Sequence, residues 1–106
     1  MEINGEIVND QVRYADLGLS SELMRAIDKK GYVQATPVQG GSIPYFMEYK
    51  DVIAKAPTGT GKTFAFGIPM VEHIDPESRD VQGLVLAPTR ELAIQIRDEL
   101  RDLCAF

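Results

Sequence analysis

The stretch Lys55–Phe64 reads KAPTGTGKTF, and its glycines limit the fold of this chain more than any other feature. Gly59 and Gly61 can adopt left-handed backbone angles and let the main chain approach an anion closely. Where a strand precedes such a loop and a helix follows it, successive N–H groups point toward a phosphate. Here the stretch 51–56 (DVIAKA) predicts a short buried strand, and a helix is expected from Gly61 onward. The stretch therefore predicts a phosphate-binding loop in an α/β fold.

The side chains that follow the glycines fit the chemistry of a nucleoside triphosphate. Lys62 supplies a mobile positive charge for the outer phosphates, and Thr63 offers a hydroxyl to Mg²⁺. The plain alternative is a glycine-rich turn with a solvated lysine, which the flanking strand and helix disfavour. At Ala56 the sequence departs from the general pattern, which has glycine there. The predicted nucleotide-binding residues of this loop are Pro57, Thr58, Gly59, Thr60, Gly61, Lys62 and Thr63.

Helices are predicted on both sides of the loop. Ser20 or Ser21 caps a helix through Lys30, which Gly31 ends. Thr36-Pro37 starts a second helix, because proline is favoured at the first helical position. Pro44 predicts a break in this second helix, and Pro69 predicts a kink or interruption in the helix after the loop. Two helices are therefore expected before the strand and the phosphate loop, and one helix after them.

A second strand and a last helix complete the predicted order. The continuous apolar run Gly83–Ala87 predicts a strand covered on both faces. Thr89 then caps a helix with an apolar stripe at Leu92, Ile96, Leu100 and Leu103. The order strand, loop, helix, strand, helix is typical of a parallel α/β unit, of which only part of the sheet is expected.

The composition limits the class of protein and its partners. With 44% hydrophobic and 25% charged residues over 106 positions, the chain resembles one ordinary globular domain. No apolar run approaches the ~20 residues of a membrane helix, and the polar start MEINGEIVND is unlike a signal peptide. We therefore expect no membrane partner. The lone Cys104 fits a reducing cytoplasm, as a partly buried apolar group. The net charge of -5 gives no support for a basic nucleic-acid surface.

Three stretches together resemble the N-terminal part of the DEAD-box ATP-dependent RNA helicases. GYVQATPVQ (31–39) resembles the family's Q motif, and APTGTGKT (56–63) resembles its motif I, including the alanine at Ala56. PTRELA (88–93) resembles motif Ia. The similarity runs from about Tyr14 to the last residue. It implies that the 106 residues are an N-terminal fragment of a RecA-like (P-loop NTPase) ATP-binding domain, with a partial parallel sheet and flanking helices.

The resemblance also implies roles for single residues. Gln39 would read the adenine edge, and Tyr14 would stack on the base, with tyrosine where the family usually has phenylalanine. Pro88, Thr89 and Arg90 would touch the RNA sugar-phosphate backbone. Each residue has a plain alternative: a solvated helix residue for Gln39, an anchoring aromatic for Tyr14, and an ordinary first-turn residue for Arg90. The implied ligands are ATP, Mg²⁺ and RNA.

The sequence departs from the family at several positions. Ala35 replaces a proline, Gly40-Gly41 loosens the helix that carries Gln39, and Tyr49 replaces a glycine. The larger departure is that no D-E-A-D or S-A-T sequence occurs. The nearest text, Arg97–Leu100 (RDEL), is expected on a solvated helix face. Without acids to hold Mg²⁺ and orient water, we expect this chain to bind nucleotide at most, with Lys62 and Thr63 acting in catalysis only in the full-length protein.

Two other interpretations stay open, and the predicted sheet adds a further expectation. One is a DNA-directed or other helicase-like ATPase, which the adenine-specifying Q motif disfavours. The other is an inert nucleotide-binding module that acts through partners, with Glu91 as a makeshift acid, although the helix dipole already explains Glu91. Half a sheet leaves an unpaired strand edge, so we also expect self-association.

Overall fold

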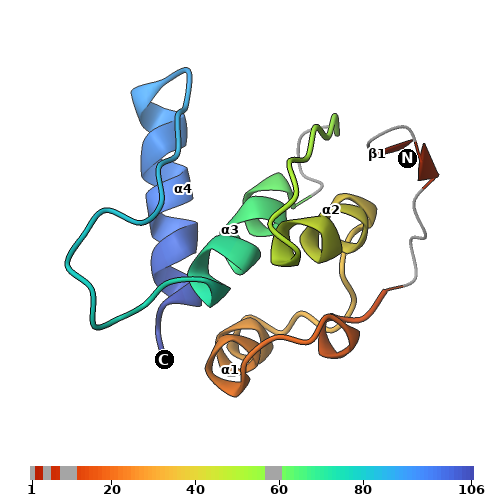
Figure 1. Cartoon of the computed structure of the whole chain (residues 1–106), viewed down its shortest axis with the longest axis horizontal. Helices are drawn as coiled ribbons and strands as arrows, with labels where there is room; N and C mark the ends of the chain where they lie inside the picture. The colour runs from red at the N-terminus through yellow and green to blue at the C-terminus, as the bar shows by residue number, and fades with distance from the viewer. Residues whose placement is uncertain (1, 4–5, 8–11, 57–60) are drawn as a thin grey trace.

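The computed structural model describes residues 2–3, 6–7, 12–56 and 61–106. Within these ranges the chain is mainly helical (Figure 1). The helices are α1 (Ser21–Lys29), α2 (Pro37–Met47), α3 (Lys62–Glu72) and α4 (Arg90–Leu103). The smaller elements are the antiparallel pair β1 (Glu2–Ile3) and β2 (Glu6–Ile7) and the 3-10 helix η1 (Tyr14–Asp16), none of which we predicted.

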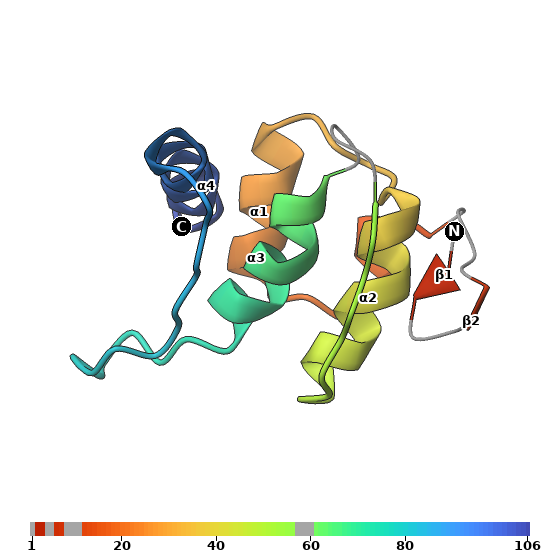
Figure 2. The ribbon, with the colours of Figure 1, turned by 90° about the horizontal axis from the view of Figure 1, so that it is seen from above.

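Helix α3 is the central element of the structure. Figure 2 shows α3 with α2 on one side and α4 on the other, and α1 behind it. The buried side chains of one core come from all four helices and from the segments before α1 and α2. They are Tyr14, Leu23, Ile27, Ala35, Ile43, Phe64, Ile68 and Leu103. The helix that follows the phosphate loop is therefore held in place from several directions.

The predicted caps at Ser20 and Thr89 and the predicted stop at Gly31 are confirmed. The Ser20 hydroxyl accepts a hydrogen bond from the backbone N–H of Leu23 at 3.3 Å and so caps α1. Thr89 caps α4 in the same way. Gly31 has φ +80° after the end of α1, a conformation that favours glycine. Helix ends depend on local hydrogen bonds, which is why sequence alone located them.

The predicted break at Pro44 and the predicted interruption at Pro69 are wrong; the alternative at Pro69, a kink, stays a prediction. Both Pro44 and Pro69 lie inside continuous helices. A proline inside a helix removes one backbone hydrogen bond, but tertiary packing supplies most of a helix's stability in a protein. Ile43 and Ile68, each next to one of the prolines, are fully buried in the shared core. This burial outweighs the lost bonds.

The parallel sheet that we predicted is not formed by the described residues. Segment 51–56 contains a single bridge residue, Ala54, and segment 83–87 contains no strand residue. Figure 2 shows the first segment running over α2 and the second leading to α4, with α3 between them. Apolar runs indicate segments suited to burial, but a parallel strand also needs a neighbouring strand. Ile53 and Leu86 are accordingly about 85% exposed.

Two further findings concern the surface. Cys104 is exposed, so its predicted partial burial is wrong; the neighbouring Leu103 takes the buried position at the end of α4. Among the described ranges, no helix combines the length and the apolar character needed to cross a bilayer.

Candidate functional site

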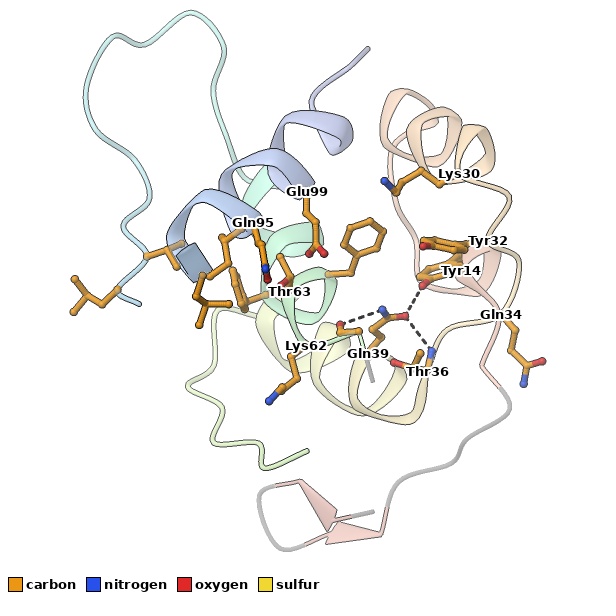
Figure 3. Close-up of a pocket in the computed structure, with 17 residues that line it drawn as sticks. Tyr14, Lys30, Tyr32, Gln34, Thr36, Gln39, Lys62, Thr63, Gln95 and Glu99 are labelled. Atoms are coloured by element: carbon orange, nitrogen blue, oxygen red, sulfur yellow. Dashed lines mark hydrogen bonds between the residues drawn. The ribbon is translucent and has the colours of Figure 1, made fainter. Parts of the chain in front are cut away.

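The amide of Gln39 joins the start of α2 to the start of α3. Its Oε1 accepts a hydrogen bond from the backbone N–H of Thr36 at 3.0 Å. Its Nε2 donates to the backbone carbonyl of Gly61 at 3.1 Å (Figure 3). A backbone N–H can only donate and a carbonyl can only accept, so these two bonds fix the orientation of the amide. Gln39 is 3% exposed, not a solvated helix residue.

Tyr14 reaches the same amide from a different part of the chain. Its hydroxyl donates to Oε1 of Gln39, and its side chain is 2% exposed. Backbone bonds hold this segment against the one before α2: Tyr14 N–H donates to the Val33 carbonyl at 3.2 Å, and Ala35 N–H donates to the Val12 carbonyl at 2.8 Å. Burial raises the pKa of Tyr14 to about 12.

Gly61 is the residue on which α3 begins. It has φ +80°, in the left-handed region, and precedes the first helical residue, Lys62. A Cβ atom at this position would lie 2.2 Å from Nε2 of Gln39. Glycine is therefore needed here both for the backbone angle and for the close approach of the Gln39 amide.

A cavity of about 820 Å³ adjoins these residues (Figure 3). Several of its lining residues were not predicted as site residues from the sequence, including Lys30, Tyr32 and Gln95. Tyr32 packs edge-on against Phe64, with 5.8 Å between the ring centroids. Its position inside GYVQATPVQ was the signal that could have identified it. The predicted site residues that line the cavity are Tyr14, Gln39, Gly61, Lys62 and Thr63.

The charges around the cavity favour an anion at the start of α3. Lys62 is exposed at the positive end of the helix dipole, and the half-buried Thr63 follows it. The other lining lysine, Lys30, is already paired with Asp102 at 2.7 Å. No group of three acidic, histidine or cysteine side chains in the described part of the chain could hold a metal ion.

The remaining predicted residues lie apart from this cluster. Pro57, Thr58, Gly59 and Thr60 fall outside the described residues. Pro88, Thr89 and Arg90 are exposed around the N-terminus of α4 and do not line the cavity, although Leu86 and Leu92 on either side do. The Thr89 hydroxyl is engaged in capping α4, at 3.2 Å from the Leu92 nitrogen.

The RDEL stretch is only partly the solvated face that we predicted. Arg97 and Asp98 form an exposed ion pair at 3.0 Å, as expected. Glu99 differs, because it is half-buried and lines the cavity. It is the one acidic residue among the described residues that line the cavity.

Comparison with known proteins gives consistent results. The family model described as DEAD/DEAH box helicase matches residues 36–106. The chain is 56% identical over 89 residues to the DEAD-box ATP-dependent RNA helicase CshA of Bacillus subtilis (strain 168), and 51% identical over 89 residues to the ATP-dependent RNA helicase CshA of Limosilactobacillus reuteri. Each match covers 84% of this chain and 18% of the relative. The chain thus spans less than a fifth of these relatives.

Solved structures are also similar. A DEAD box protein from the hyperthermophile Methanococcus jannaschii matches with a TM-score of 0.81 and 38% identity, over 86% of this chain and 25% of that one. The RNA helicase Prp28 from Chaetomium thermophilum, bound to ADP, matches with a TM-score of 0.81 and 34% identity, over 97% of this chain and 26% of that one. The described helices are therefore arranged as in these proteins.

Proposed function

This chain belongs to the DEAD/DEAH box helicase family, and we propose that it forms the ATP-binding part of an ATP-dependent RNA helicase. In the full-length protein, ATP binding and hydrolysis would be coupled to RNA binding and local duplex unwinding. The observation that carries the proposal is the bond between the Gln39 amide and the Gly61 carbonyl. It joins a side chain suited to reading a base to the loop and helix end suited to binding phosphates, beside one cavity.

In the proposed complex, each part of the nucleotide meets a different group. Gln39 reads the edge of adenine, and Tyr14 contributes the aromatic contact with the base. The backbone of Pro57–Gly61 and the Lys62 ammonium hold the phosphates. The Thr63 hydroxyl would help to hold Mg²⁺. The metal would neutralise phosphate charge.

We further propose that the 106 residues alone bind nucleotide without hydrolysing it. Lys62 and Thr63 stabilise bound phosphates, but hydrolysis also requires a group that orients the attacking water. The sequence contains no D-E-A-D stretch. Glu91 is exposed in the first turn of α4 and does not line the cavity, which disfavours it as a substitute acid. RNA-dependent ATP hydrolysis by the purified chain, lost in Lys62→Ala, would contradict this.

The proposed RNA contact lies at the N-terminus of α4. Pro88, Thr89 and Arg90 are exposed there, and the helix dipole favours a phosphate at this end. With a net charge of -5, this contact depends on a few placed groups. In the full-length protein, we expect Arg90→Ala to weaken RNA binding at constant salt while leaving ATP affinity within about twofold. An equal loss of both affinities would argue for a structural role instead.

Equilibrium titration of the chain with ATP and GTP tests the nucleotide proposal. We expect preference for ATP, and we expect Gln39→Ala to remove the preference while leaving some phosphate-dependent affinity. Lys62→Ala is the complementary variant, because it should weaken ATP and GTP alike. Equal affinity for ATP and GTP in the unmodified chain would instead favour the inert phosphate-binding module, and the absence of binding would reject both.

A further inference from the structure

We propose that the Tyr14 hydroxyl is a specificity-determining latch that occupies the acceptor position on Gln39 needed by the adenine amine. This inference rests on the proposed nucleotide site and adds to it a residue that restrains adenine binding. The elements that form the latch are η1, which carries Tyr14, and the first turn of α2, which carries Gln39. Figure 3 shows the two side chains meeting at the edge of the cavity.

The direction of the Tyr14–Gln39 hydrogen bond follows from the backbone. The Thr36 N–H requires an acceptor, and the Gly61 carbonyl requires a donor. Oε1 of Gln39 must therefore face Thr36, and Nε2 must face Gly61. Because the Tyr14 hydroxyl meets the oxygen side of the amide, it must act as the donor.

The capacity of the amide then limits what else it can bind. The Gln39 oxygen accepts about two hydrogen bonds, and Thr36 and Tyr14 supply both. The nitrogen has two hydrogens, of which the Gly61 carbonyl takes one. The amide can still donate to a ring nitrogen of a base, but it has no acceptor position left for an amine.

Adenine presents an amine donor beside a ring-nitrogen acceptor, a pair that a glutamine amide can bind with both of its ends. Of the two donors already on the oxygen, the Thr36 N–H is fixed in the backbone at the start of α2. The Tyr14 hydroxyl is the one that can leave, because a side chain carries it and that side chain can shift toward the cavity that Tyr14 lines. Adenine binding through its amine therefore breaks the Tyr14–Gln39 bond, whereas a purine without the amine leaves it intact.

Dissociation constants measured for two ligands and two proteins isolate this competition. The ligands are ATP and purine riboside 5′-triphosphate, which lacks the amine; the proteins are the unmodified chain and Tyr14→Phe, which keeps the ring. We expect Tyr14→Phe to bind ATP about three- to tenfold more tightly, the range of one neutral hydrogen bond. The affinity for purine riboside triphosphate should change by less than about twofold. Tyr49→Phe, which removes an exposed hydroxyl elsewhere, should leave both affinities unchanged.

Each other outcome overturns the latch. Weaker ATP binding by Tyr14→Phe would mean that the hydroxyl orders the amide for adenine, and equal changes for the two ligands would mean that it does not act through the amine. If the unmodified chain binds neither triphosphate, the proposed nucleotide-binding function fails as well. If it binds both but gives one of the other outcomes above, only the role of the Tyr14 hydroxyl fails.

A second measurement needs no variant. The Tyr14 Cζ carbon-13 shift, which reports on hydrogen bonding of the phenol, should move further with ATP than with the amine-free analogue. Equal movement with the two ligands would overturn the proposal even if Tyr14→Phe does not fold.

Discussion

A Cβ atom on Gly61 would lie 2.2 Å from the Gln39 amide nitrogen, far inside van der Waals contact. Gly61→Ala must therefore displace Gln39 as well as strain a backbone held at φ +80°. Gly31 is a matched control, because it has the same φ but no atom within 4 Å of its added Cβ. Left-handed strain alone costs about 1–2 kcal/mol, so both variants should be destabilised.

We expect Gly61→Ala to lose about 1–2 kcal/mol more of the free energy of unfolding than Gly31→Ala, because it also breaks the Gln39 contacts. Urea denaturation of the two variants measures the difference. Combining Gly61→Ala with Gln39→Ala should remove much of the excess. Equal losses in Gly61→Ala and Gly31→Ala would show that Gln39 adapts without cost.

The buried Tyr14 hydroxyl predicts a loss of stability in alkali. Its pKa is about 12 in the folded chain and 10.0 for the unperturbed group. The unfolded chain therefore releases this proton first, and the free energy of unfolding falls as the pH rises from about 10 through 12. We expect the urea concentration at the midpoint of denaturation to fall with rising pH between pH 9 and 12. This fall should be less steep in Tyr14→Phe than in the unmodified chain. Parallel curves for the two proteins would contradict this prediction.

Sequence alone located features that depend on neighbouring residues. The caps at Ser20 and Thr89 and the left-handed glycine at the start of α3 follow from hydrogen bonds and backbone angles within a few positions. The predicted sheet failed because a strand exists only with a partner, and the described segments 51–56 and 83–87 lie on different sides of α3. Local pattern therefore predicted helix ends better than sheet pairing.

The candidate site shows the same contrast between features set by neighbouring residues and features set by long-range packing. The resemblance identified Tyr14 and Gln39 separately, but nothing in their spacing predicted the hydrogen bond between them. That contact requires the segment before α1 to pair with the segment before α2, through the bridge between Arg13 and Gln34. The inward position of Glu99 was missed for a similar reason, since it depends on how α4 packs against α3.

The ion pair between Lys30 and Asp102 predicts a stability window in pH. The Lys30 ammonium lowers the pKa of Asp102, and the Asp102 carboxylate raises the pKa of Lys30. The Asp102 contribution is lost as the pH falls below the ordinary range of a carboxyl. The Lys30 contribution is lost as the pH rises past the ordinary range of an ammonium. The melting temperature of Asp102→Asn should therefore lie below that of the unmodified chain near neutral pH, but the two should be equal at pH 2. A difference that persists at pH 2 would point to packing instead.

Tyr49 stores strain that can be removed. It has φ +61° after the end of α2, in the region that favours glycine, and its ring stacks on His73 at 4.3 Å between centroids. We expect Tyr49→Gly to raise the melting temperature, because relief of about 1 kcal/mol or more of strain exceeds the value of an exposed stacking contact. Tyr49→Phe keeps both the strain and the ring, so its melting temperature should not change. A lower melting temperature for Tyr49→Gly would mean that the stack contributes more.

The apolar segment before α4 predicts self-association of this chain. Val81, Leu84 and Leu86 are 87%, 78% and 86% exposed, and such residues gather on surfaces that bind other proteins. We expect light scattering during size-exclusion chromatography to give a mass that rises with concentration. The double variant Leu84→Lys/Leu86→Lys should shift the chain toward the monomer. Ala15→Lys/Ala93→Lys adds the same charge at two other exposed positions and should not do so. A monomer at all concentrations would contradict the prediction, and equal effects of both double variants would assign the association to net charge.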